Sequence, residues 1–91
     1  MAGRKKTDQD TRLSLSFAAE YGHLQQCQEI LERGHPVDYQ DDKGWTALIQ
    51  ASEAGQTEVV QILLKHGANP NLTTNDGNTA LHMAASNGHI R

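Results

Sequence analysis

The side chains in this chain that could carry out chemistry are chiefly histidines and one cysteine, Cys27. Histidine can act as a general base or bind zinc, and a cysteine thiolate can act as a nucleophile. The candidate histidines are His23, His66, His82 and His89. Their spacing matches no HExxH, paired-cysteine zinc or phosphate-binding glycine pattern. We therefore expect neither an active site nor a metal, cofactor or small-molecule substrate.

Cys27 has a simpler interpretation than a reactive thiol. It occupies the same phase as Val60 on an apolar helix face, so we expect it in the core rather than at a reactive site. A lone cysteine cannot close an internal disulfide, which suits a reducing compartment such as the cytoplasm or the nucleus.

Charge and hydropathy exclude several kinds of partner. The 91 residues carry a formal net charge of −3, which does not indicate binding to nucleic acid or to an anionic membrane. No apolar run approaches the roughly 20 residues that cross a bilayer. The basic run Arg4, Lys5 and Lys6 is shorter than an import or phosphate-binding patch, so we interpret residues 1–7 as a flexible tail.

An internal repeat organises the remaining chain. Shifting the sequence by 33 residues superimposes Gly44 on Gly77 and Thr46 on Thr79, with apolar residues in the same phase around them. A fixed period of this size is typical of stacked repeat units that cannot bury their apolar faces alone. The units are a degenerate capping repeat at 8–40, a complete repeat at 41–73 and a truncated third repeat at 74–91.

Each unit is expected to contain helices with an apolar face. Apolar spacing of three and four residues predicts helices at 13–21, 24–33, 46–54 and 57–66, with a further helix after Thr79. In the fourth of these, the predicted apolar face is broad and comprises Val59, Val60, Ile62, Leu63 and Leu64. The third unit stops at Arg91, where its second helix would start. This stop suggests either a fragment of a longer array or a short product that finds a partner for its exposed apolar surface.

Three stretches resemble the ankyrin repeat family: GWTAL from Gly44, GNTALH from Gly77 and LLKHGANPN from Leu63. The resemblance covers 8–91 and implies an all-α solenoid of stacked antiparallel helix pairs with hairpin-like loops. The first unit departs from the pattern, with LSLS at 13–16 where the family has Thr-Pro-Leu-His. Ile49 replaces the family's histidine, so the Thr-to-His hydrogen bond can form only between Thr79 and His82.

The resemblance also implies a concave binding face made of loop tips and first helices. From the second unit it would contain Asp42, Lys43, Trp45, Gln50, Glu53 and Ala54; from the third, Asn75, Asp76, Asn78, Met83, Ser86 and Asn87; and from the first, Phe17, Glu20 and Tyr21, with Arg12 near its start. Trp45 is the expected anchor, because large aromatics dominate interface energetics. The alternative is that Trp45 only stiffens its own loop, and Tyr21, Tyr39 and Met83 could likewise cover seams between repeats.

These observations favour a non-catalytic protein-binding module whose partner the sequence does not identify. The alternative is a fragment or cap of a larger scaffold, enzyme or channel, with self-association through the third unit as one outcome. The acidic residues Asp38, Asp41 and Asp42 fit a solvated loop better than a docking site for a basic partner, although the neighbouring Trp45 keeps the second interpretation open. Asn71 resembles an asparagine that is hydroxylated in many ankyrin repeats.

Overall fold

The computed structural model describes residues 8–88, with side chains described from residue 15 onward. Within this part of the chain there are five α-helices and no strands: α1 (Asp8–Tyr21), α2 (Leu24–Glu32), α3 (Ala47–Glu53), α4 (Thr57–Lys65) and α5 (Ala80–Ser86). The predicted all-α fold is confirmed, although α1 begins five residues before the predicted position of residue 13. The predicted tail at 1–7, the Arg12 side chain and His89 lie outside the described residues.

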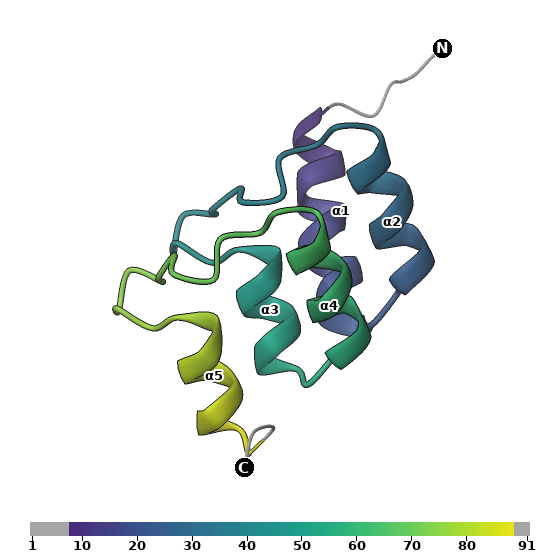
Figure 1. The fold of residues 1–91 in the computed structure, drawn as a ribbon. Helices are drawn as coiled ribbons and strands as arrows, with labels where there is room; N and C mark the ends of the chain where they lie inside the picture. Colours follow the sequence, from purple (N-terminus) through teal and green to yellow (C-terminus); the bar gives the residue numbers. More distant parts are fainter. Residues whose placement is uncertain (1–7, 89–91) are drawn as a thin grey trace.

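The helices form two layers (Figure 1). The inner layer contains α1, α3 and α5 side by side, and the outer layer contains α2 and α4. Each helix pair is joined by the same tight turn: His23 N–H donates to the Ala18 carbonyl at 2.8 Å, and Gln56 N–H donates to the Ala51 carbonyl at 2.9 Å. The repeat seen in the sequence is therefore a repeat of backbone hydrogen bonds.

Threonine side chains cap the starts of α3 and α5, where the first N–H groups have no helical partner. Thr46 Oγ1 accepts from Ile49 N–H at 3.1 Å, and Thr79 Oγ1 accepts from His82 N–H at 3.3 Å. His82 Nδ1 in turn accepts from Thr79 N–H at 3.2 Å and lies 3.2 Å from Thr79 Oγ1. The expected Thr-to-His interaction is thus confirmed, and Ile49 leaves α3 with only half of it.

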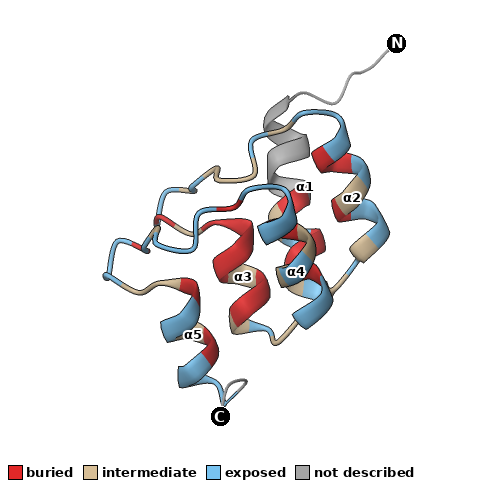
Figure 2. Cartoon of the chain, viewed as in Figure 1, coloured by how far each residue is buried: buried red, intermediate tan, exposed pale blue. Residues whose placement is uncertain are grey.

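The core is centred on α3 (Figure 2). Leu48, Ile49 and Leu63 are among its most deeply buried large side chains. Ala18 and Ala51 are fully buried between the inner helices, and their small side chains permit close packing of α1 against α3. Burying a side chain such as Leu48 contributes about 1.5–3 kcal/mol. This packing fixes the inner layer as a platform for exposed residues.

The prediction of a broad buried face on α4 is only partly correct. Val59 and Leu63 are buried, but Val60 and Ile62 are half-buried and Leu64 is 44% exposed. The equivalent residues on α2, Cys27 and Leu31, are 0% and 7% exposed. The difference arises because α4 packs against α2, whereas no helix within residues 8–88 covers the other side of α4.

Candidate functional site

The loop before α3 is closed by the carboxylate of Asp41. Its Oδ1 accepts hydrogen bonds from the N–H groups of Lys43 and Trp45, both at 2.9 Å. Asp41 N–H donates to the Trp45 carbonyl at 3.0 Å, and Gly44 N–H donates to the Asp41 carbonyl at 2.9 Å. Four hydrogen bonds around one aspartate therefore fix the backbone that carries Trp45.

The next loop is held directly against this one. Asn75 donates its backbone N–H to the Lys43 carbonyl at 2.8 Å and its side-chain amide to the Asp42 carbonyl at 2.9 Å. Gln40 Nε2 donates to the carbonyls of Gly44 at 2.9 Å and Thr73 at 3.1 Å. The two loops thus present their tips as one ordered surface, and Asn75 has a structural use besides its predicted binding role.

A hollow of about 510 Å³ lies between this loop and α3. It brings together five residues predicted from the second unit, together with Tyr39 and Asp41; its lining comprises Tyr39, Asp41, Asp42, Lys43, Trp45, Gln50 and Glu53. We call this the loop–helix hollow. Its lining contains three carboxylates, one ammonium group and two aromatic side chains.

Trp45 combines both roles considered from the sequence. Its side chain is half-buried and packs against the hydrophobic core, and it also lines the loop–helix hollow. The ring is therefore held in place by the fold while part of it remains accessible to a ligand.

The acidic residues considered as one cluster are divided by the structure. Asp38 Oδ1 accepts from Asn69 N–H at 2.9 Å, and Asp38 does not line the loop–helix hollow. Glu53 of α3 takes its place beside Asp41 and Asp42. Sequence spacing alone could not show this exchange, because Glu53 reaches the hollow from a helix eight residues further along the chain than Trp45.

Two exposed aromatic side chains extend the surface onto α1. Phe17 and Tyr21 are 56% and 57% exposed, and their ring centroids lie 4.7 Å apart with planes tilted by 48°. Phe17, Gln50 and Met83 are spaced by 33 residues and occupy equivalent positions on α1, α3 and α5. We call the row of exposed and half-buried residues that these three define the inner-helix face.

The third-unit residues are less concentrated. Asn75, Asp76, Ser86 and Asn87 are exposed, whereas Asn78 and Met83 are half-buried. Met83 packs against the core, and Asn87 Nδ2 donates to the Met83 carbonyl at 3.0 Å near the end of α5. None of these residues lines the loop–helix hollow. In the first two units, Glu20 is half-buried and Ala54 is exposed.

A second hollow, of about 340 Å³, lies between α4 and α5 and is largely apolar. Its lining comprises Leu48, Ala51, Ser52, Gly55, Thr57, Val60, Gln61, Leu64, Pro70, Ala80, Leu81 and Ala84. Leu81 is 63% exposed, which makes it the most exposed of the large hydrophobic side chains described. This α4–α5 groove corresponds to the unpartnered apolar surface that we expected beside the third unit.

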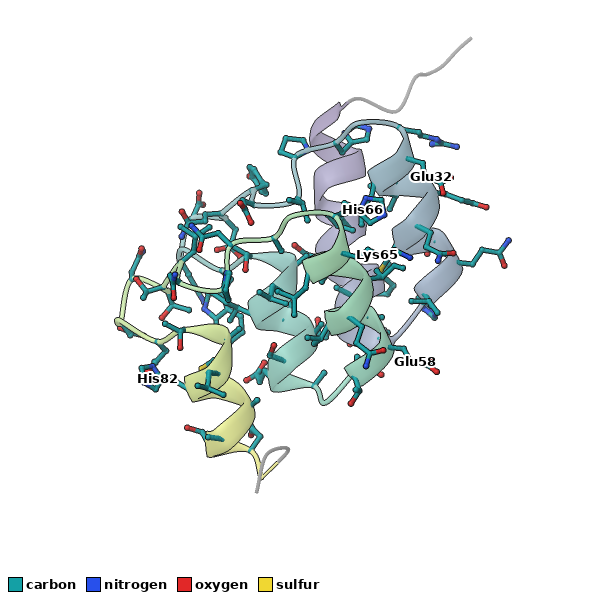
Figure 3. The ribbon with its side chains drawn as sticks, in the orientation of Figure 1. Glu32, Glu58, Lys65, His66 and His82 are labelled. Carbon is teal, nitrogen blue, oxygen red and sulfur yellow. The ribbon has the colours of Figure 1, made fainter. Side chains whose placement is uncertain are left out.

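The residues with chemical potential are dispersed. Burial raises the pKa of the Cys27 thiol from 9.0 to about 11, which keeps it protonated and unreactive at neutral pH. His66 at the end of α4 and His82 on α5 are well separated in Figure 3. Within residues 8–88, no group of three or more His, Cys, Asp or Glu side chains could hold a metal ion. None of the helices described is both long and apolar enough to cross a bilayer.

Comparison with known proteins agrees with this architecture. The family model described as ankyrin repeats, in three copies, matches residues 15–91. The chain therefore belongs to the ankyrin repeat family.

Three relatives show how this family segment is used in larger proteins. Over 80 residues the chain is 46% identical to the E3 ubiquitin-protein ligase XBAT33 of Arabidopsis thaliana, a match that covers 85% of the chain and 15% of the ligase. It is 32% identical over 83 residues to human ankyrin repeat and SOCS box protein 3, covering 88% of the chain and 16% of that protein. It is 38% identical over 77 residues to human DNA-binding protein RFXANK, covering 84% of the chain and 30% of that protein. The chain thus spans less than a third of each of these relatives.

Proposed function

We propose that this chain is a non-catalytic protein-binding module that holds a partner against the loop–helix hollow and the inner-helix face. Ankyrin repeats are generally protein–protein interaction modules. The observation that carries the proposal is the loop–helix hollow, where residues of a rigid loop and of α3 surround one partly accessible tryptophan. The division into units at 8–40, 41–73 and 74–91 is part of the same proposal.

Pre-organisation supports this surface as a binding site. Its loop backbone is fixed by hydrogen bonds to Asp41 and Asn75, so little conformational entropy is lost when a partner binds. Tryptophan and tyrosine contribute disproportionately to interface energetics, because they bury a large area with few rotatable bonds. Trp45 and Tyr39 in the hollow and the Phe17–Tyr21 pair on α1 supply such side chains.

The test is to fill the loop–helix hollow and measure binding to a ligand selected on the unmodified chain. Gln50→Arg places a long side chain in the hollow, and Gln26→Arg makes the same change on the exposed surface of α2. We expect Gln50→Arg to weaken binding about 10-fold or more, with an unchanged circular dichroism spectrum, and Gln26→Arg to have little effect. Equal affinities for both variants would contradict the proposal.

A second proposal is that the chain acts as a cap or structural part of a larger scaffold, enzyme or channel, or associates with a second copy of itself. The observation that favours it is the α4–α5 groove with its exposed Leu64 and Leu81. Sedimentation equilibrium tests the self-association: a dimer that dissociates on Leu81→Glu supports it, and a monomer at every concentration rejects it.

Two further features belong to the proposed function. We infer a reducing compartment, the cytoplasm or the nucleus, because the single cysteine is buried in the core. Asn71 remains a proposed hydroxylation site; it is exposed, and its backbone N–H donates to Asn69 Oδ1 at 2.9 Å. Mass spectrometry of natively expressed protein should detect the added mass of one oxygen on the peptide that contains Asn71, and an unmodified peptide would reject this site.

A further inference from the structure

The exposed aromatic side chains define a docking surface whose charge is strongly one-sided. The loop–helix hollow has the carboxylates of Asp41, Asp42 and Glu53 in its lining, against the single ammonium group of Lys43. Carboxylates around a concave, partly apolar surface concentrate a negative potential there. The surface therefore attracts cationic groups and repels anionic ones.

The aromatic lining narrows the choice among ligands. A guanidinium can stack on an indole ring while its N–H groups donate to carboxylates at its edge. Both kinds of group are present, because Trp45 lines the same hollow as Asp42 and Glu53. An apolar side chain would instead bury carboxylates without supplying hydrogen bonds, which is unfavourable.

The size of the surface indicates a segment rather than a single side chain. The hollow of about 510 Å³ exceeds what one arginine side chain fills, so it accommodates part of the backbone as well. On the neighbouring helix α1, Phe17 occupies the position equivalent to Gln50 of the hollow. Packed helices lie about 8–10 Å apart, a distance that about three residues of extended chain cover.

We propose that the partner presents an extended basic segment, with an arginine in the loop–helix hollow and an apolar side chain about three residues away on the Phe17–Tyr21 pair. The guanidinium stacks on Trp45 and pairs with the carboxylates of Asp42 and Glu53. Asp41 adds charge while its Oδ1 holds the loop. This assignment rests on the proposed protein-binding function and specifies the chemistry of the partner.

The test begins with a displayed library of random linear peptides of about twelve residues, selected on the whole chain. The selected peptides are expected to be enriched in arginine with an apolar residue about three positions away. One of them is then synthesised with citrulline in place of arginine, which keeps the shape and removes the charge. We expect affinity to fall about 10-fold or more with citrulline, and binding of the arginine peptide to weaken as salt is raised.

Isosteric variants separate charge from shape on the protein side. Asp42→Asn combined with Glu53→Gln removes two charges from the hollow, and Glu32→Gln combined with Glu58→Gln removes two from the outer helices α2 and α4 (Figure 3). We expect about a 10-fold loss for the first pair and less than about a 2-fold change for the second, with both variants folded by circular dichroism.

The outcomes distinguish this inference from the function on which it rests. Selected ligands that lose affinity with Gln50→Arg but are not basic, or that are indifferent to Asp42→Asn with Glu53→Gln, overturn the basic-segment assignment and leave the binding module standing. No selected ligand, or ligands insensitive to Gln50→Arg, overturns both.

Discussion

Asn75 donates its backbone N–H to the carbonyl oxygen of Lys43 at 2.8 Å, and through this bond one loop tip is built directly on the previous one. The Asn75 side chain reinforces the contact by donating to the Asp42 carbonyl at 2.9 Å. The two loops share an internal turn as well, since Gly44 N–H donates to the Asp41 carbonyl and Gly77 N–H donates to the Thr74 carbonyl. The proposed binding surface is therefore stabilised by contact between repeats and not by either loop alone.

Gly44→Ala tests this contact against a matched control. Gly44 and Gly77 have φ values of +83° and +86°, so alanine is strained at both positions. A Cβ on Gly44 would also lie 2.8 Å from Asn75 Oδ1 and 2.9 Å from Asn75 N, whereas a Cβ on Gly77 would meet nothing within 4 Å. By urea denaturation we expect about 1 kcal/mol of destabilisation for Gly77→Ala and about 2–3 kcal/mol for Gly44→Ala. Equal losses would mean that the loop contact contributes nothing.

Leucines at equivalent positions test the uncovered face of α4. Leu31 is 7% exposed beneath the second unit, and Leu64, 33 residues later, is 44% exposed beside the α4–α5 groove. Leu31→Ala should lower the free energy of unfolding by about 2–4 kcal/mol, and Leu64→Ala by less than about 1 kcal/mol. A comparable loss at both positions in denaturant titrations at low protein concentration would show that Leu64 is covered in solution.

Much of the fold could be predicted from the sequence because the repeat constrains it at several levels. The 33-residue spacing predicted the helix pairs, and the Thr79–His82 interaction followed from two residues at the right separation. The burial of α4 could not be predicted in the same way. Val60 and Leu64 have the residue types of a core, and only the placement of neighbouring helices determines whether they are covered.

The candidate site was predictable in composition but not in arrangement. Five of its residues were named from their equivalence to family positions, and the structure gathers all five around one hollow. The contribution of Asp41 as a backbone acceptor and the separation of Asp38 toward Asn69 depend on loop conformation. Neighbouring aspartates in a turn look alike in the sequence, because their hydrogen-bond partners are backbone groups that carry no residue identity.

The stability of the chain should fall in alkaline solution because of Cys27. Burial raises the pKa of its thiol from 9.0 to about 11, so the folded state holds this proton more tightly than the unfolded state. The corresponding stability, up to about 2–3 kcal/mol, is fully present below pH 9 and is lost as pH rises from about 9 to about 11. Urea titrations across this range should show the loss, and Cys27→Ala should remove this part of the pH dependence. Identical pH profiles for both proteins would contradict a buried, neutral thiol.

The capping interaction of α5 should be cooperative. Thr79→Ala removes the acceptor for His82 N–H, and His82→Ala removes the acceptor for Thr79 N–H. We expect each change to cost about 1 kcal/mol, and the double variant to cost less than the sum, because both residues act on one another. Thermal unfolding of the three variants measures this coupling; strictly additive losses would show that the two hydrogen bonds act independently.

The most direct test of the central claim is the footprint of a selected ligand on the chain, mapped by amide chemical shifts in NMR spectra. The account predicts that shifts concentrate at Trp45, Gln50 and Glu53, extend to Phe17 and Tyr21, and leave the outer surfaces of α2 and α4 unchanged. A footprint confined to α2, or to the α4–α5 groove around Leu64 and Leu81, would contradict it.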